Sequence, residues 1–260
     1  MDSEEVLKLI RDVADEVVNP RFRALADHQV QEKNPGDLVT VADHEAEELL
    51  TRALTAAYPD AVVLGEEAHS GNPDLMTSYA AAEHAFTVDP VDGTKNFVNG
   101  SPDHAVMVGE TRNGEAVRAW IWQPQHERAY VAERGAGAWV NGHRLVSPER
   151  PEDPGRWRGV TSRRALLGRR LGDLRPLELT WVCCGVDYPK LIEGEADFIV
   201  YGRPNPWDHV PGSLLVAESG GYVGTLEGEP YDPRAAPAGG LVVAADRRVY
   251  DTVLAGSPAG

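Results

Sequence analysis

The sequence predicts an α+β arrangement in the first half of the chain and an α/β arrangement in the second. Two segments with apolar residues at helical spacing come first, at residues 3–25 and 41–58. Short apolar runs of strand-like composition follow them, up to about residue 133. Beyond residue 147, apolar runs alternate with helical segments, which is typical of an α/β layer. We therefore expect helices and a mainly antiparallel sheet, followed by a mixed α/β half.

The two N-terminal helices have recognisable boundaries. The first begins behind Asp2, and Glu5 stands three positions further on, which is the pattern of a capping box. The second is expected from Val41 to Tyr58 and ends before a proline. Between the helices, residues 29–37 are polar and contain an Asn-Pro-Gly sequence, so we expect a loop there.

Five apolar runs predict the strands of the first half. Each of the first two runs ends where carboxylates begin, which is common where a site lies at strand ends. Residues 112–115, Arg-Asn-Gly-Glu, predict a hairpin turn, and residues 125–128 predict a second turn. The five runs are residues 61–64, 85–88, 105–108, 117–122 and 129–131.

A segment rich in proline, glutamate and arginine, residues 147–157, marks the predicted boundary between two halves of the chain. We expect an N-terminal half at residues 1–146 and a C-terminal half at residues 147–260. In the C-terminal half, the expected strands are residues 159–161, 177–182, 197–201 and 241–244. The expected helices there are residues 164–174, residues 186–195 and a segment after Trp207.

The charge balance excludes several classes of partner. The chain has 260 residues, with 25 lysines and arginines against 41 aspartates and glutamates, which gives a formal net charge of −16. This charge repels the phosphates of nucleic acids and anionic membrane surfaces, so we expect neither as a partner. The two cysteines are adjacent and provide no disulfide framework, and the N-terminus is acidic where a secretory signal is basic. We therefore expect a cytoplasmic protein.

Three acidic segments carry the candidate chemistry. They are Gly65-Glu66-Glu67, Asp89-Pro90-Val91-Asp92-Gly93-Thr94-Lys95-Asn96-Phe97 and Pro206-Trp207-Asp208-His209. In a chain with 41 acidic residues most such groups are solvated surface, but the first two segments directly follow apolar strands. The rigid Pro90 and the permissive Gly93 also indicate a specific backbone path between the carboxylates.

Carboxylates that converge in this way predict a cation site. They repel one another unless they are protonated or bridged by cations, and oxygen ligands suit Mg²⁺ and Mn²⁺ better than zinc. Two such ions can hold a phosphate, orient a water molecule and stabilise the leaving oxygen. The N–H groups of Gly93 and Thr94 can bind phosphate oxygens if they open a helical turn. The spacing therefore predicts metal-assisted hydrolysis of a phosphate ester.

Taken together, these segments resemble the signature of the inositol monophosphatase family of Mg²⁺-dependent, lithium-sensitive phosphatases. Lys33 ahead of Asp37-Leu38-Val39-Thr40-Val41-Ala42-Asp43 and the downstream Ala217-Glu218-Ser219-Gly220-Gly221 also fit, so the resemblance covers about residues 5–255. It implies a layered α-β-α-β-α sandwich of the inositol monophosphatase and fructose-bisphosphatase type, and a homodimer. It also implies two or three Mg²⁺ ions, with Mn²⁺ as the alternative, and a small phosphorylated metabolite as substrate.

The resemblance implies a role for each carboxylate. Glu66 and Asp89, with the backbone carbonyl of Val91, would hold a first metal. Asp89 would bridge to a second metal held by Asp92 and Asp208, and Glu66 would also face a third, water-rich site. The plainer reading of Asp208 is a cap on the helix that follows it.

For catalysis, the resemblance assigns the positioning and deprotonation of the attacking water to Thr94, hydrogen-bonded to Asp43. Glu67 would support the surroundings of that water, and its plainer reading is an exposed acid. Gly93 and Thr94 would bind the phosphate through their N–H groups. Thr40-x-x-Asp43 is also the pattern of a capping box, so Asp43 has a structural reading beside the catalytic one.

The resemblance is weakest on the substrate side. Inositol-specific members carry a carboxylate about seven residues before the Trp-Asp aspartate, and this chain has Tyr201 there. Tyr201 could stack on a ring, Arg203 could pair with a second anionic group, and Asp187 could bind a polar or cationic substituent. Asp92 and Asp208 are expected to border the same space. The substrate stays open among inositol-like phosphates, sugar phosphates, fructose bisphosphate, histidinol phosphate and 3′-phosphoadenosine phosphates.

The remaining candidates have plainer predicted roles. Cys183 and Cys184 are expected to be small buried apolar groups, and Lys33 is either solvated or close to the substrate region. His209 is the one histidine that we single out, because it follows Asp208. Two other functions stay open: a non-catalytic binding protein stabilised by metal, and a two-metal nuclease, which the net charge of −16 disfavours.

Overall fold

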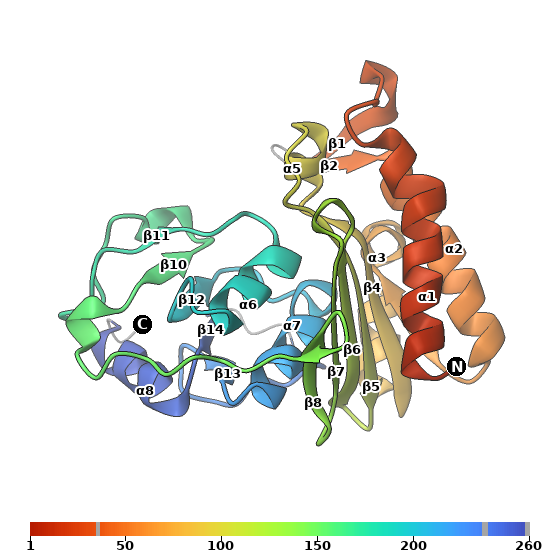
Figure 1. The fold of residues 1–260 in the computed structure, drawn as a ribbon. Helices are drawn as coiled ribbons and strands as arrows, with labels where there is room; N and C mark the ends of the chain where they lie inside the picture. Colours follow the sequence, from red (N-terminus) through yellow and green to blue (C-terminus); the bar gives the residue numbers. More distant parts are fainter. Residues whose placement is uncertain (35–36, 236–238, 258–260) are drawn as a thin grey trace.

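The computed structural model describes residues 1–34, 37–235 and 239–257, and it arranges helices and sheets in alternating layers (Figure 1). The helices α1 (Ser3–Val13) and α2 (Val41–Ala57) cover one face of a seven-stranded sheet. The helices α6 (Cys184–Ile192) and α7 (Pro206–Glu218) lie between this sheet and a five-stranded sheet, whose far face packs against α8 (Arg247–Gly256). The result is the predicted layered α-β-α-β-α sandwich.

The seven-stranded sheet is a meander, in which strands that follow one another in the chain are also neighbours in the sheet. β3 and β4 are parallel, and the later pairs are antiparallel, as expected for the first half. At the predicted hairpin, Asn113 and Gly114 have φ angles of +51° and +81°, which the tight turn requires. The strands are β3 (Val62–Gly65), β4 (His84–Asp92), β5 (Ala105–Arg112), β6 (Glu115–Gln123), β7 (Arg128–Glu133), β8 (Gly137–Val140) and β9 (His143–Arg144).

Apolar residues on both faces of this sheet hold the layers together. Trp120 belongs to the cluster beneath α1 and α2, whereas its neighbour Ile121 belongs to the cluster beneath α6 and α7. Successive side chains of a strand point to opposite faces, so a strand that is covered on both sides is apolar throughout. Val210 and Leu214 of α7 join the second cluster and thereby fix the C-terminal half against the first sheet.

The first helix differs from the prediction at its end. The capping box of Asp2 and Glu5 is present, but α1 passes into a π-helical turn at Ala14–Val18 and then a 3₁₀ turn at Asn19–Arg21. Proline in that last turn has no N–H to continue the helix, so the regular helix stops well before residue 25.

The prediction of a loop at residues 29–37 is wrong. An antiparallel hairpin of β1 (Val30–Asn34) and β2 (Asp37–Thr40) occupies this segment. Within the ranges that the structure describes, the two strands pair only with each other and belong to no larger sheet. They therefore have no continuous apolar face to bury against a core, and the segment lacks the alternating apolar residues by which a strand is predicted. The predicted turn residues 35–36 lie outside the described residues.

The C-terminal half carries a mixed five-stranded sheet in the order β11-β10-β12-β14-β13. β10 is parallel to β11 and β12, while β14 is antiparallel to β12 and β13. The helix expected after residue 186 is confirmed as α6, and the helix expected after Trp207 as α7. The strands are β10 (Gly159–Thr161), β11 (Glu178–Leu179), β12 (Phe198–Tyr201), β13 (Tyr222–Thr225) and β14 (Leu241–Ala244).

The prediction of a helix at residues 164–174 is wrong. Only a 3₁₀ turn at Arg164–Leu166 forms, because Gly168 and Gly172 take φ angles of +72° and +55°, which a helix does not allow. The strand expected at residues 177–182 is reduced to β11. β13 and α8 were not predicted.

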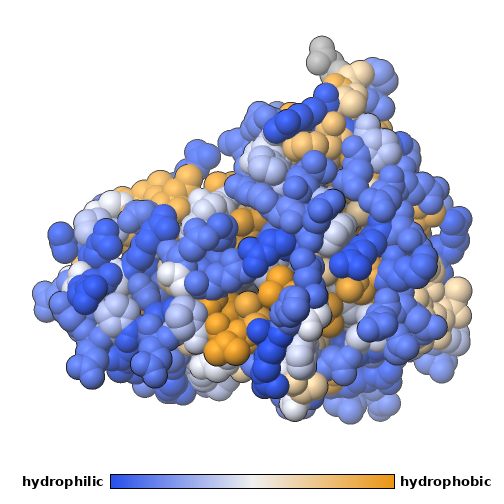
Figure 2. All heavy atoms as spheres, in the orientation of Figure 1, coloured by the Kyte–Doolittle hydropathy of each residue, from blue (hydrophilic) through white to orange (hydrophobic). Residues whose placement is uncertain are grey.

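The surface is mostly hydrophilic on the face drawn in Figure 2, in keeping with a chain of which 25% of the residues are charged. Large exposed apolar side chains occur singly, for example Val146, Leu179 and Val182. In the described part of the chain, no helix combines the length and the apolar character that crossing a membrane requires.

Candidate active site

The strand β4 carries two of the predicted carboxylates at its C-terminal end. In a regular strand Asp89 and Asp92 would point to opposite faces, because they are three residues apart. Asp89 pairs with Met107 and Asp92 with Ala105, so three steps on β4 match two steps on β5. This bulge turns both carboxylates to the same face of the sheet, the face that packs against α6 and α7.

The two glutamates of the first acidic segment come to the same edge. β3 is parallel to β4, and its last residue, Gly65, pairs with Val88. Glu66 directly follows Gly65 and Asp89 directly follows Val88, so the two acids lie side by side where the strands end. Glu66 and Glu67 open the short helix α3 (Glu66–Gly71). The carboxyl ends of two neighbouring parallel strands therefore bring Glu66 and Asp89 together, as the strand-end argument predicts.

A residue that the sequence did not single out fixes this helix start. The carboxylate of Glu47, on α2, accepts hydrogen bonds from the N–H groups of Glu67 at 2.7 Å and Ala68 at 2.8 Å. It satisfies two of the free N–H groups of the short helix. A Cβ at Gly65 would collide with this carboxylate, which explains the glycine there.

Lys33 faces the same two glutamates. Its Nζ lies 2.8 Å from Oε1 of Glu66 and 2.9 Å from Oε1 of Glu67. Burial disfavours the charge of Lys33, but the charges and hydrogen bonds of Glu66 and Glu67 outweigh it and raise its pKa. Of the two predicted locations, the structure selects the site and not bulk solvent.

Thr94 and Asp43 are hydrogen-bonded, as expected. Oγ1 of Thr94 lies 3.1 Å from Oδ1 of Asp43 and 3.0 Å from the carbonyl oxygen of Val91. The other oxygen of Asp43, Oδ2, accepts from the N–H and the hydroxyl of Thr40, which forms the capping box of α2. Asp43 therefore has both the structural and the site-facing role. Its burial raises its pKa to about 6, and the charge of Glu67 adds to this.

Asp92 joins the two halves of the chain. Its Oδ2 accepts from the N–H of Gly185 and from the thiol of Cys183, which lies 2.9 Å away. The N–H groups of Cys184 and Gly93 also favour its ionised form, although burial raises its pKa. These donors come mainly from the start of α6, so the N-terminal end of α6 is held against the end of β4.

Asp208 lies in the first turn of α7 and completes the group. Its Oδ2 accepts a hydrogen bond from Nδ2 of Asn205 at 3.1 Å. An oxygen of Asp208, an oxygen of Asp92 and Sγ of Cys184 all lie within 4.8 Å of one another. Cys184 was expected to be a buried apolar group, but it is only partly buried and its sulfur borders the carboxylates.

The donor set fits a hard divalent cation. Burial and the charge of Asp208 raise the pKa of Glu66 to about 8, and burial and the charge of Asp92 raise that of Asp208 to about 7. Asp89 is 1% exposed, its pKa is raised by burial and by these neighbours, and its Oδ1 has no hydrogen-bond partner among the described residues. Without a cation, these groups cannot all be ionised at neutral pH. Converging carboxylate oxygens are the ligands that Mg²⁺ prefers.

Two of the predicted substrate residues, Asp187 and Tyr201, are buried in the core. Asp187 is 1% exposed, and its Oδ1 accepts from the N–H of Trp181 at 2.8 Å. Tyr201 is 2% exposed, stacks on Tyr188 with ring centroids 5.6 Å apart, and directs its hydroxyl to Asp187. These contacts give both residues a packing role in the structure, and their contact with a substrate stays a prediction. Arg203 is exposed.

His209 is also a structural residue. It is 1% exposed, its Nε2 donates to the carbonyl of Arg203 at 2.8 Å, and its Nδ1 accepts from the hydroxyl of Tyr188 at 2.8 Å. This tautomer follows from the carbonyl, which can only accept. Burial lowers the pKa of His209 to about 4, so the ring is neutral and holds the backbone before α7.

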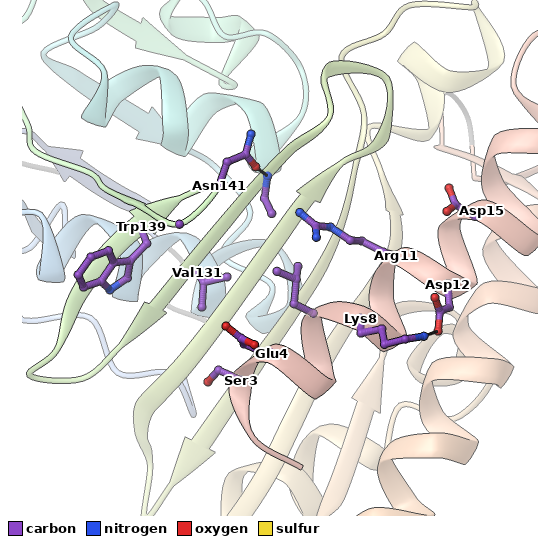
Figure 3. Close-up of a pocket in the computed structure, with 12 residues that line it drawn as sticks. Ser3, Glu4, Lys8, Arg11, Asp12, Asp15, Val131, Trp139 and Asn141 are labelled. Carbon is purple, nitrogen blue, oxygen red and sulfur yellow. Dashed lines mark hydrogen bonds and ion pairs between the residues drawn. The ribbon is translucent and has the colours of Figure 1, made fainter.

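A cavity of about 800 Å³ lies elsewhere, on the α1 side of the seven-stranded sheet (Figure 3). It lies between α1 and the strands β7 and β8, and it mixes acidic and basic side chains. Arg11 covers the ring of Trp122 at 4.6 Å, and Lys8 is paired with Asp12. It contains none of the predicted site residues, so its volume does not make it the better candidate for the chemistry.

Known proteins with similar sequences cover most of the chain. The sequence profile of the inositol monophosphatase family matches residues 2–257. A fructose-1,6-bisphosphatase/inositol-1-monophosphatase of Aquifex aeolicus is 27% identical over 96% of this chain and 93% of the relative. An inositol-1-monophosphatase of Rhizobium meliloti is 33% identical over 80% of this chain and 79% of the relative. The Nus factor SuhB of Pseudomonas aeruginosa is 30% identical over 76% of each chain.

Solved structures share the fold. An IMPase of Thermotoga maritima superposes with a TM-score of 0.79 at 23% identity, over 97% of this chain and 95% of that chain. An IMPase/NADP phosphatase solved with Mg²⁺ and phosphate has a TM-score of 0.80 at 21% identity, over 98% of this chain and 92% of that chain. The sequence profile and the carboxylate group at the strand ends agree: this chain belongs to the inositol monophosphatase family and is a phosphatase.

Proposed function

We propose that this phosphatase is a Mg²⁺-dependent phosphomonoesterase, which hydrolyses a small phosphorylated metabolite by attack of a water molecule. The observation that carries the proposal is the convergence of Glu66, Asp89, Asp92 and Asp208 from three separate elements, α3, β4 and α7. One of these carboxylates keeps an unpartnered buried oxygen, and such an arrangement is costly unless a cation binds.

The residues that would hold the ions are those that the family resemblance indicates. Glu66, Asp89 and the carbonyl of Val91 suit one Mg²⁺, and Asp89, Asp92 and Asp208 suit a second. When bound, Mg²⁺ or Mn²⁺ would supply positive charge for the phosphate and lower the pKa of a bound water molecule. An IMPase/NADP phosphatase of the same fold was solved with Mg²⁺ and phosphate, which supports this choice of ion.

Thr94 and Asp43 form a path for the proton that the attacking water must lose. Oγ1 of Thr94 can accept the water proton while its own hydroxyl proton passes to Oδ1 of Asp43, 3.1 Å away. Burial raises the pKa of Asp43 to about 6, which makes it a better proton acceptor than a solvated aspartate and still leaves it ionised at neutral pH. The hydrogen bonds from Thr40 to the other oxygen hold the carboxylate in position.

Glu67 and Lys33 are positioning residues. Oε2 of Glu67 is buried without a partner among the described residues, while its Oε1 accepts from Lys33 at 2.9 Å. The free oxygen is available to orient a water molecule beside Thr94. Gly93 and Thr94 are proposed to bind the phosphate oxygens through N–H groups, with Gly93 at a φ angle of +80° that places the turn at the end of β4.

The substrate side favours a small ester with a further anionic or polar group. Arg203 is exposed five residues before Asp208, so its guanidinium can pair with a second anion such as another phosphate. Tyr201 fills the position where inositol-specific relatives are expected to carry a carboxylate, and it is buried. We propose a sugar phosphate or a bisphosphate ahead of myo-inositol phosphate. A cytoplasmic homodimer that is sensitive to lithium completes the proposal.

The test is a panel of phosphate esters assayed for release of phosphate with Mg²⁺ and with a chelator. We expect turnover that depends on Mg²⁺ and falls by at least about 100-fold in Asp89→Asn. Asp60→Asn, at an exposed aspartate outside the site, is the matched control and should keep full kcat/KM. Turnover that survives in Asp89→Asn, or a protein that melts at higher temperature with Mg²⁺ yet hydrolyses no ester, would contradict the proposal.

A further inference from the structure

We propose that the phosphatase site also contains a soft-metal position, at which the thiolate of Cys184 and the carboxylates of Asp92 and Asp208 bind Zn²⁺ or Cd²⁺ in preference to Mg²⁺. The position shares Asp92 and Asp208 with the proposed function, but its sulfur ligand has no part in that function. The soft-metal position predicts that the unsubstituted protein binds Zn²⁺ or Cd²⁺ there even when Mg²⁺ is present.

The geometry brings three different elements to one point. Cys184 lies in the first turn of α6, Asp92 at the end of β4 and Asp208 in the first turn of α7. Their ligand atoms all lie within 4.8 Å of one another. A tetrahedral zinc ion with bonds of about 2.0–2.3 Å separates its ligand atoms by about 3.6 Å, so the side chains need to close by only about 1 Å. Three protein ligands leave the fourth position for water.

A second observation points to a cation at this place. Asp89 is 1% exposed, and its Oδ1 has no hydrogen-bond partner among the described residues. The bulge at the end of β4 turns Asp89 to the same face of the sheet as Asp92, so its carboxylate lies beside the same group. A buried carboxylate oxygen without a donor is the group that a nearby dication stabilises.

The ligand types favour a soft ion. Mg²⁺ is bound by oxygen and rarely by sulfur, whereas Zn²⁺ and Cd²⁺ bind thiolate strongly. When the bond to the metal forms, Sγ of Cys184 releases its proton to the buffer, and the metal keeps the sulfur deprotonated. With two carboxylates and one thiolate, the position carries three negative charges for the dication, one more than the same position with a neutral thiol.

The neighbouring cysteine provides the contrast. Cys183 is 3% exposed, and its thiol donates to Oδ2 of Asp92 at 2.9 Å, so it already has a partner. Its sulfur is not part of the group of ligand atoms that Cys184 joins with Asp92 and Asp208. The chain has two cysteines in all. Any cadmium–thiolate signal therefore comes from one of these two adjacent residues.

The experiment titrates the full chain, stripped of metals, with Cd²⁺ and follows the ultraviolet charge-transfer band of a cadmium–thiolate bond. We expect the band in the parent and in Cys183→Ser, and its loss in Cys184→Ser. Calorimetry with Zn²⁺ in the presence of excess Mg²⁺ should show at least about tenfold weaker binding for Cys184→Ser. Cys184→Ala serves as the second variant, and circular dichroism shows that each variant is folded.

Three outcomes overturn the inference: no band in the parent, a band that persists in both Cys184 variants, or a band that disappears in Cys183→Ser. These outcomes are independent of the proposed function. If no phosphate ester is hydrolysed with Mg²⁺ but the band depends on Cys184, the proposed function fails and the soft-metal position stands. If hydrolysis needs Mg²⁺ but the band is absent, the reverse holds.

Discussion

Removal of the Thr94 hydroxyl separates a catalytic role of this residue from a structural one. In Thr94→Ala, the hydrogen bonds of Oγ1 to Asp43 at 3.1 Å and to the carbonyl of Val91 at 3.0 Å are lost. Asp43 keeps its two hydrogen bonds from Thr40, so the carboxylate stays in place. The substitution therefore removes the proposed relay for the water proton and leaves its acceptor intact.

The expected magnitudes differ for activity and stability. A positioned general base contributes about 10²–10⁴-fold in rate, so kcat should fall by that factor. One partly buried hydrogen bond contributes about 0.5–1.5 kcal/mol to the free energy of unfolding, so stability should fall by that amount only. Alanine is also a good helix former, so α5 (Thr94–Val98) should remain folded.

The assay measures kcat on the best ester of the panel at saturating Mg²⁺, together with unfolding in denaturant. Thr94→Ser keeps the hydroxyl and should recover most of the rate. Thr40→Ala is the matched control, because it removes a hydrogen bond of 2.6 Å to the same carboxylate and weakens the cap of α2. It should cost about 1 kcal/mol of stability and much less of kcat.

Two results would refute this reasoning. If Thr94→Ala retains the parent kcat, the hydroxyl takes no part in moving the proton. If Thr94→Ser is as slow as Thr94→Ala while both are folded, the residue acts through its methyl group or backbone, and not through Oγ1.

Two further predictions concern stability. Gly65→Ala should lower the free energy of unfolding by about 1–3 kcal/mol, measured in denaturant, because the new methyl group displaces the Glu47 carboxylate from the start of α3. Gly71→Ala is the control, because a Cβ there meets nothing, and it should keep the parent's free energy of unfolding. An equal loss of stability in both variants would contradict the prediction. Burial lowers the pKa of His104 to about 4, so below its unfolded value of about 6.5 the unfolded chain binds a proton that the native ring does not. Stability should therefore decline from pH 6.5 towards pH 4 by up to about 1.4 kcal/mol per unit, and His104→Gln should remove this part of the slope.

The carboxylates could be predicted from the sequence because their signal is local. Glu66 and Asp89 each follow the end of an apolar strand, and parallel neighbours bring such ends together. The bulge that turns Asp89 and Asp92 to the same face is not visible in the sequence, since it depends on how β5 pairs with β4. The sequence therefore predicts which carboxylates approach one another, but the turn that aligns them is known only from the pairing of the strands.

Cys184 and Glu47 were missed for a different reason. Cys184 borders Asp92 and Asp208 only after α6 and α7 pack against the sheet, so no local pattern marks it. Glu47 is one acid among several on α2, and its contact with the N–H groups of α3 crosses two elements. Tyr201 was singled out because it lies seven residues before Asp208, and its burial against Tyr188 could not be predicted from that spacing.

The unpartnered oxygen of Asp89 argues that the site is held for a ligand and not for stability. Asp92 is also buried, but α6 supplies it with the N–H of Gly185 and the thiol of Cys183, so its charge is compensated within the chain. Asp89 receives no such donor on Oδ1, although asparagine there would present an uncharged group of the same shape. A buried carboxyl among three others destabilises the metal-free fold, and binding of a cation to the native state alone reverses that cost. The carboxyl group of Asp89, which destabilises the fold when no cation is bound, is thus a group that a phosphate-binding metal centre would require.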